Sequence, residues 1–388
     1  MQNTHFYPYL PDTNHNSEMK KRLSLILLSI VSAGAFAQKT DYNLLVGTYT
    51  NTGKSEGIYT YSFNAKTAET ALKTITKGIE NPSYVAISPD KKFVYAVNET
   101  GNTSTVSAFK YEAKSGTLTF INKVDSHGAD PCFLTVDDKN VIVANYTGGS
   151  LAVFPRKADG SLTNAIQVIK HSGKSIDPKG RQESAHVHMV KFTPDGKYLI
   201  VNDLGEDQTY IYNYNASGKD KTLTQKSVIK TNAGTGPRHI VFSPDGKSAY
   251  LAHEFNGSIS VFSYANGVLT KTQEIGTVEK DFNGKIDGAD IHVSPDGKFV
   301  YESNRGDANA ISVFKITAGG KLQFVETIST LGKGPRNFSI DPTGSFLLVG
   351  HQYTDEVVIF NRDKTTGKLS DSGKRIKLGA AVCLTFDK

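Results

Sequence analysis

The chain has 388 residues, with 44 Lys and Arg against 38 Asp and Glu, which gives a formal net charge of +6. This excess is small for the length and is spread out, with no Lys/Arg block beyond residue 22, which argues against nucleic-acid binding. Tryptophan is absent, Tyr and Phe are plentiful, and helix-forming patterns are weak beyond the N-terminus. These features predict one large all-β domain rather than two or three domains.

The N-terminal region has the pattern of an export signal. Lys20, Lys21 and Arg22 form a basic segment, residues 23–36 form a short apolar run, and residues 35–37 read Ala-Phe-Ala, a small-residue cleavage box. We expect translation to start at Met19, residues 1–37 to be upstream residues and signal peptide, and residues 38–388 to form a single domain. The apolar run is too short to span a bilayer comfortably. We therefore predict an exported protein, periplasmic or secreted, that makes no membrane contact after the signal is removed.

Six segments along the chain share one pattern, in which a strand-like run meets a turn of the SPDGK type and a second strand-like run follows. They are ISPDKKFVYAVN, VDDKNVIVANY, FTPDGKYLIVND, FSPDGKSAYLAH, VSPDGKFVYESN and IDPTGSFLLVGH, with turn residues at Asp90, Asp138, Asp195, Asp245, Asp296 and Thr343. The intervals are 48, 57, 50, 51 and 47 residues. This is the period of a β-propeller blade.

Each repeat predicts a blade of four antiparallel strands, and Gly in the turns supplies the positive φ that such hairpins need. Two orphan segments complement each other: residues 42–63 match the second and third strands of a blade, and residues 380–386 match the first. Joined, they predict a seventh blade closed by both ends of the chain, which hides sheet edges. We expect seven blades, with six or eight as the alternatives, and a propeller that is stable as a monomer.

Cys132 and Cys383 occupy the same repeat position, so each should open an innermost strand, in blades that are not adjacent. A disulfide between them is geometrically doubtful, which favours two buried free thiols.

The loops that enter the first strand and leave the second strand of each blade should crowd one mouth of the central channel. Asn98, Asn145 and Asn202 repeat one exit position, where a turn amide satisfies backbone groups. Later blades break this symmetry with charged and imidazole side chains that packing does not require. The residues that stand out are His186, His188, Asp203, Arg238, His239, Glu254, Arg305 and Arg336. Together they predict a site for an anionic substrate with a base available.

Structural alternatives exist for several of these residues. Glu254 could form an ion pair with Arg238 and be structural, and Asp203 could cap a turn. His186 and His188, two apart on an extended segment, could bind a metal with Glu254 or Asp203, but no third ligand at fixed spacing supports this. We predict no metal and no cofactor. The inserted stretch His171 to Glu183 lengthens the third repeat, and we expect it to lie over the mouth and to tune which ligand enters.

Several motifs resemble those of the lactonase family of seven-bladed propellers, which includes propeller-type 6-phosphogluconolactonases and carboxy-cis,cis-muconate cyclases. The resemblance covers nearly all of residues 42–386 and rests on LLVGTYT, HGADPCFLTVDDKNVIVANYTGG, SAHVHMVKFTPDGKYLIVNDLGEDQTYIY, GTGPRHIVFSPDGKSAYLAHE and GKGPRNFSIDPTGSFLLVGHQYTDE. In the family's proposed site a His, two Arg and a Glu gather at the channel mouth. The matching positions are His186 or His188, Arg238, Glu254 and Arg305.

The resemblance implies hydrolysis of a small anionic lactone or sugar acid derivative, such as 6-phosphogluconolactone, by an activated water. Glu254 or a neighbouring His would be the base, and Arg238 would stabilise the oxyanion. Arg305 and Arg336 would hold the phosphate or carboxylate of the substrate, and His239 and Asp203 are further candidates for substrate binding. Two alternatives use the same fold: a cycloisomerase that moves a proton between carboxylate clamps, and a non-catalytic ligand-binding propeller.

Overall fold

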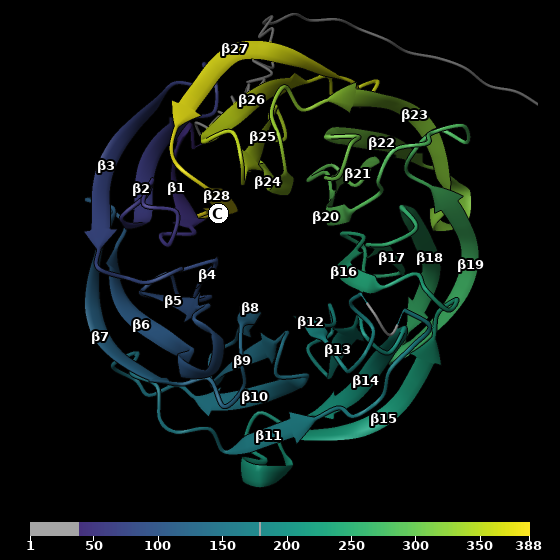
Figure 1. The fold of residues 1–388 in the computed structure, drawn as a ribbon. Helices are drawn as coiled ribbons and strands as arrows, with labels where there is room; N and C mark the ends of the chain where they lie inside the picture. The colour runs from purple at the N-terminus through teal and green to yellow at the C-terminus, as the bar shows by residue number, and fades with distance from the viewer. Residues whose placement is uncertain (1–38, 178–179) are drawn as a thin grey trace, which may run out of the picture. The chain divides into compact units, whose positions relative to one another are not determined.

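The computed structural model describes residues 39–177 and 180–388, so the predicted export signal lies outside the described residues. The polypeptide of residues 39–388 forms one unit of seven sheets arranged around a central channel (Figure 1). Each sheet has four antiparallel strands, which confirms the predicted seven-bladed propeller. Among the described residues, no helix is long and apolar enough to cross a membrane.

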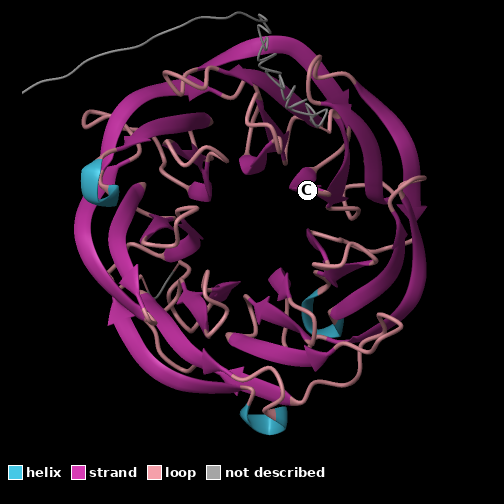
Figure 2. Cartoon of the chain, turned by 180° about the vertical axis from the view of Figure 1, so that it is seen from behind, coloured by secondary structure: helices cyan, strands magenta, loops and turns pink. Residues whose placement is uncertain are grey.

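The blades follow one another along the chain, from the innermost to the outermost strand. The first complete blade contains β4 (Tyr84–Ile87), β5 (Phe93–Asn98), β6 (Thr105–Glu112) and β7 (Thr117–Asp125), and the second contains β8 (Pro131–Val136), β9 (Asn140–Asn145), β10 (Ser150–Pro155) and β11 (Gln167–Lys170). The third contains β12 (Val187–Phe192), β13 (Tyr198–Asp203), β14 (Gln208–Tyr214) and β15 (Leu223–Lys230), and the fourth contains β16 (Pro237–Phe242), β17 (Ser248–His253), β18 (Ser258–Ala265) and β19 (Val268–Gly276). The fifth contains β20 (Gly288–Val293), β21 (Phe299–Asn304), β22 (Ala310–Ile316) and β23 (Leu322–Ser329), and the sixth contains β24 (Pro335–Ile340), β25 (Phe346–His351), β26 (Glu356–Arg362) and β27 (Leu369–Lys377). Three short 3₁₀ helices lie in the connections, at Gly101–Thr103, Lys219–Lys221 and Ala318–Gly320 (Figure 2).

The seventh blade is built from both ends of the described chain, as predicted. Its strand order is β28 (Ala381–Phe386), β1 (Asp41–Thr48), β2 (Gly57–Asn64) and β3 (Thr70–Lys77), with Leu44 opposite Phe386 in the register. Figure 1 shows β28 at the channel beside β1, and β3 at the rim. The pairing joins the two ends of the ring, so that no innermost strand is left without a neighbouring strand.

The SPDGK turns have the structural role that their composition predicts. In the third blade, the Asp195 carboxylate accepts hydrogen bonds from the Thr193 hydroxyl and the Lys197 amide, and Gly196 has a φ of +66°. The same pattern recurs at Asp245 and Asp296. These carboxylates are therefore used by the turns and lie outside the candidate site.

The hydrophobic core lies between the blades, where side chains of neighbouring sheets interlock. A typical contact is the edge-to-face pair of Phe63 in the closing blade and Phe346 in the sixth blade, with ring centroids 5.9 Å apart. Cys132 on β8 and Cys383 on β28 are both buried and free, in innermost strands as predicted.

Candidate active site

A β-bulge recurs near the start of the innermost strands and determines which side chains line the channel mouth. In β16, Pro237 pairs with His253 and His239 pairs with Ala252, so Arg238 is an extra residue without a partner. The same shift makes Cys132, His188 and Arg336 the extra residues of β8, β12 and β24. Bulges re-aim side chains and are frequent beside active sites. One backbone irregularity, repeated from blade to blade, thus presents a Cys, a His and two Arg at the same level.

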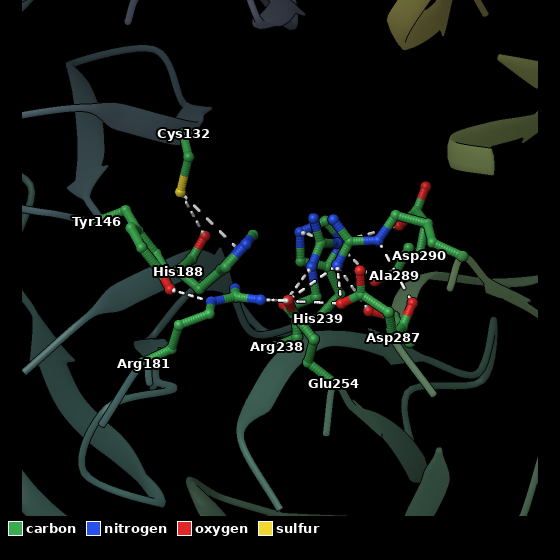
Figure 3. Close-up of polar contacts among 12 residues, drawn as sticks. Cys132, Tyr146, Arg181, His188, Arg238, His239, Glu254, Asp287, Ala289 and Asp290 are labelled. Atoms are coloured by element: carbon green, nitrogen blue, oxygen red, sulfur yellow. Dashed lines mark hydrogen bonds and ion pairs between the residues drawn. The ribbon is translucent and has the colours of Figure 1, made fainter. Parts of the chain in front are cut away.

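Glu254 follows β17 and is the centre of a buried ion-pair cluster (Figure 3). Its Oε2 accepts a hydrogen bond from Arg238 Nε at 3.0 Å, while Arg181 Nη1 and Arg305 Nη2 lie 2.5 and 2.9 Å from Oε1. The carboxylate is fully buried. Burial alone would raise the pKa of Glu254, but the three guanidinium groups, that of Arg305 first, hold it well below its ordinary value. The sequence analysis considered an ion pair between Glu254 and Arg238 as a structural alternative, and the structure contains this ion pair.

The two oxygens of this carboxylate differ. Oε2 accepts the hydrogen bond from Arg238, whereas Oε1 lies against the guanidinium groups of Arg181 and Arg305. Both oxygens of the carboxylate are therefore engaged by positive charge.

Arg238 is held by a chain of buried polar groups. Its Nη1 donates to the Ala289 carbonyl at 2.5 Å and lies 3.2 Å from Nε2 of His239, whose Nδ1 is 2.8 Å from Asp290 Oδ1. Burial and the nearby positive charge of Arg238 lower the pKa of His239 to about 4, so the ring is neutral, with Nδ1 donating to Asp290 and Nε2 accepting from Arg238. Among the described residues, Nη2 of Arg238 has no partner and is available to a ligand.

His188 and Arg336 complete the set of available groups. With Arg238 and Cys132 they line one small cavity in the channel mouth. The His188 Nδ1 is 3.8 Å from the Cys132 sulfur, and Nε2 has no hydrogen-bond partner in the described part of the chain. Burial and the charge of Arg238 hold the pKa of His188 well below its ordinary value, so the imidazole is neutral.

Arg336 differs from the other guanidinium groups because no described carboxylate lies within ion-pair distance of it. It stacks over the Tyr49 ring at 5.6 Å, and the Tyr49 hydroxyl donates to Glu99 at 2.9 Å. Burial opposes its charge, but Tyr49 and Glu99 raise the pKa of Arg336 above its ordinary value. Arg336 therefore offers a charged, planar donor group to an anion in the cavity.

Two predicted site residues lie beside this cavity rather than in its lining. The His186 ring stacks on Tyr146 with centroids 4.5 Å apart, and its nitrogens lie 3.1 Å from the Tyr146 carbonyl and 3.2 Å from Glu183. Asp203 accepts hydrogen bonds from the backbone amides of His186 and Glu206 and is 2.7 Å from His171 Nδ1. Their predicted roles in catalysis and substrate binding stay predictions, and the contacts shown here hold the backbone directly before β12, the strand that carries His188.

Arg181 and Asp287 belong to the cluster but were missed in the sequence. Arg181 lies in the inserted stretch predicted to cover the mouth, and its side chain, 42% exposed, reaches Glu254 and donates to the Tyr146 hydroxyl at 3.0 Å. Asp287 pairs with Arg305 at 2.9 Å. Burial and the neighbouring Glu254 carboxylate raise the pKa of Asp287 despite this ion pair. The insertion was a usable signal for Arg181. Asp287 takes the position before the first strand that Asp130 has in the second blade, so its residue type alone gave no signal.

The residues weighed as metal ligands do not converge on one point. Among the described residues, the His, Cys, Asp and Glu side chains close enough to share an ion are His171, Asp203 and Glu206. Their atoms are already bonded: His171 to Asp203 and Tyr212, and Glu206 to the Gly173 amide and the Tyr210 hydroxyl. This group connects the inserted stretch to the third blade.

Comparisons with known proteins identify the family of the chain. A family model described as "Lactonase, 7-bladed beta-propeller" matches residues 43–386. The 6-phosphogluconolactonase of Bacillus subtilis is 37% identical over 352 residues, covering 89% of this chain and 99% of that protein. A crystal structure of a candidate 6-phosphogluconolactonase of Bacteroides fragilis is 43% identical, with a TM-score of 0.87 and coverage of 91% and 99%. A periplasmic gluconolactonase of Pseudomonas aeruginosa is 35% identical, with a TM-score of 0.85 and coverage of 89% and 99%. The chain belongs to the lactonase family of seven-bladed β-propellers.

Proposed function

We propose that this lactonase-family enzyme hydrolyses a sugar lactone, 6-phosphogluconolactone or a related aldonolactone, to the open-chain acid. The observation that carries the proposal is the repeated bulge, which brings His188, Arg238 and Arg336 to one cavity with donor or acceptor atoms that have no partner among the described residues. An imidazole and two guanidinium groups are what the reaction needs, namely a proton acceptor, an oxyanion donor and an anion clamp. Relatives named as lactonases, at 35–43% identity over most of the chain, support the same reaction.

The proposed reaction uses a water held by His188. Nε2 of the neutral ring accepts a proton from the water as its oxygen attacks the lactone carbonyl carbon. Nη2 of Arg238 donates to the carbonyl oxygen as negative charge develops on it. The tetrahedral intermediate collapses with cleavage of the ring C–O bond, and His188 returns the proton to the departing alkoxide. The product is a free carboxylic acid, which loses a proton to solvent.

The low pKa of His188 follows from its surroundings and changes when an anion binds. Burial lowers this pKa most, and Arg238 and Arg336 lower it further by repulsion. An anionic substrate group placed against Arg336 offsets this positive charge and raises the pKa of the imidazole toward its ordinary value. Binding of the substrate would thereby make His188 a stronger base, since a useful base has a pKa near the working pH.

Glu254 has a second role in this proposal. Because it contacts three guanidinium groups, it holds Arg238 in place and balances the positive charge of the mouth. The base role that the sequence analysis gave to Glu254 stays a prediction.

We further propose an exported, monomeric enzyme. The predicted signal in residues 1–37 and the similarity to a periplasmic gluconolactonase support a location outside the cytoplasm. Phosphorylated gluconolactone is a cytoplasmic compound, so an unphosphorylated sugar lactone fits this location better.

Substitution of the two neighbouring histidines tests the assignment. In His188→Gln we expect kcat for lactone hydrolysis to fall by about 10²–10⁴-fold, the usual contribution of general base catalysis, with little change in Tm. His186→Gln should lose much less, because its ring lies against Tyr146. Equal turnover of His188→Gln and the wild type, each corrected for spontaneous ring opening, would remove His188 from the base role. Loss of turnover in Glu254→Gln at unchanged stability would transfer that role to Glu254.

A further inference from the structure

Two cavities lie along the channel, and side chains of the innermost strands line both of them. Just below the bulged residues, Tyr84 and Phe133 face the channel with ring centroids 4.0 Å apart, and Phe133 meets the His239 ring at 5.3 Å. Tyr84 lines the small cavity at the catalytic mouth, and Tyr84 and Phe133 line a second cavity. Tyr84 is the one residue that the two cavities share, so its ring lies between them.

The second cavity has a volume of about 380 Å³, within the range of ligand sites in proteins. Its walls combine the apolar side chains of Leu134, Val136 and Phe386, beside Tyr84 and Phe133, with polar and charged groups. The SPDGK-type turn after β4 contributes Ser88, Pro89 and Lys91. The cavity therefore opens at the turn end of the innermost strands, opposite the catalytic mouth.

A cationic side chain lies in this cavity. Lys191 of β12 is partly buried, and no described residue accepts a hydrogen bond from its ammonium group or pairs with it as a carboxylate. Burial lowers the pKa of Lys191, and repulsion from Lys388, which lines the same cavity, lowers it further, while the charge of Asp290 acts in the opposite direction. An anion beside Lys191 would offset the repulsion from Lys388 and compensate the buried positive charge.

The carboxylate in the lining does not serve as that anion. Asp387 accepts hydrogen bonds from the backbone amide and side chain of Asn43 and from the Tyr111 hydroxyl, and Lys39 lies 3.5 Å away. The hydrogen bonds to Asn43 and Tyr111 and the contact with Lys39 therefore satisfy this carboxylate. The hydroxyl of Thr135, by contrast, has no hydrogen-bond partner in the described part of the chain and can donate to a ligand.

We propose that this cavity is a second binding site, which takes a small carboxylate with an apolar carbon body. The carboxylate would bind the Lys191 ammonium and the Thr135 hydroxyl, and the carbon body would lie against Tyr84 and Phe133. The site is separate from the reaction at the opposite mouth, because the two cavities open at opposite ends of the innermost strands and share only Tyr84. It therefore stands or falls separately from the proposed lactone hydrolysis.

Calorimetric titration of the full chain tests the site, with benzoate as the probe and benzamide as its neutral isostere. We expect benzoate to bind with one-to-one stoichiometry, benzamide to bind at least tenfold more weakly, and Lys191→Met to weaken benzoate binding at least tenfold. The matched control is Lys197→Met, which removes the same charge from the exposed turn after β12; it should bind benzoate as the wild type does. Arg336→Met should also bind it unchanged.

Equal binding of benzoate and benzamide, wild-type binding by Lys191→Met, or no binding by the wild type would overturn the proposal. Loss of binding in Arg336→Met with retention in Lys191→Met would place benzoate at the catalytic mouth and would overturn it too. If Lys191→Met fails to fold, acetylation of the wild-type lysines followed by peptide mass spectrometry replaces it. Benzoate, but not benzamide, should then protect Lys191 at least tenfold while leaving Lys197 reactive, and absence of protection would contradict the site.

Discussion

Replacing Glu254 by Gln tests the ion-pair cluster, because the substitution removes one negative charge and keeps the side-chain volume. In the wild type this carboxylate compensates Arg238 and Arg305, which are only 2% and 6% exposed. Removing one partner of a buried ion pair leaves uncompensated buried charge and costs about 3–5 kcal/mol. A domain of roughly 350 residues has an unfolding entropy of about 0.7 kcal/mol/K, so Tm should fall by about 4–7 °C.

The pH dependence of the same variant gives an independent check. The pKa of Glu254 is depressed in the folded state, so its contribution is fully present above the unfolded value of about 4.3 and is lost as pH falls through the folded value. The stability difference between wild type and Glu254→Gln should therefore be constant from pH 6 to 8 and shrink in strong acid. Scanning calorimetry at several pH values measures this. Asp287→Asn, which also removes a partner of Arg305, is the matched control and should cost less because Asp287 is partly exposed. A Glu254→Gln protein with wild-type Tm at pH 7 would refute the cluster's structural role.

Three further predictions follow from single residues. Arg181→Met should raise KM for an anionic lactone up to about fivefold, matching the roughly 1 kcal/mol of a half-exposed ion pair, whereas Lys174→Met in the same inserted stretch should not change it. Burial raises the pKa of Glu302 well above its ordinary value, so the folded state keeps a proton that the unfolded state loses. Relative to Glu302→Gln, the wild type should therefore lose up to about 1.4 kcal/mol of stability per pH unit above pH 4.3. Urea unfolding at several pH values measures this difference, and a difference that does not change with pH would contradict the prediction. Burial also raises the pKa of the Cys132 thiol and that of the Cys383 thiol, the latter to about 12. Iodoacetamide at pH 8 should therefore leave both thiols unmodified in the native protein and alkylate both after denaturation. Alkylation of either thiol in the native protein would contradict this prediction.

The sequence predicted the blades well because their signal is local and repeated. The SPDGK turns mark a hairpin in each complete blade, and the complementary ends, residues 42–63 and 380–386, gave the closing blade without further information. Turn chemistry and strand alternation depend on neighbouring residues, so a single sequence contains them.

The candidate site was predicted only in part, because β-bulges change which side chains of the innermost strands face the channel. An extra residue in a strand leaves no mark in the sequence, yet it breaks the alternation that places His186 and His188 on one face. The structure instead stacks His186 on Tyr146 and places His188 in the cavity lining. The contact between Arg181 and Glu254 joins an insertion to the next blade, and neither spacing nor composition encodes such a pairing.

The most direct test of the account is hydrolysis by the purified chain of residues 38–388, with gluconolactone and 6-phosphogluconolactone as substrates, each corrected for spontaneous ring opening. The account predicts saturable acceleration of at least one lactone, and a KM that rises in Arg336→Met, more strongly for the phosphorylated substrate. Preference for plain gluconolactone would support the proposed extracytoplasmic substrate, and preference for the phosphorylated one would contradict that part. No acceleration of either lactone would contradict the proposed function itself.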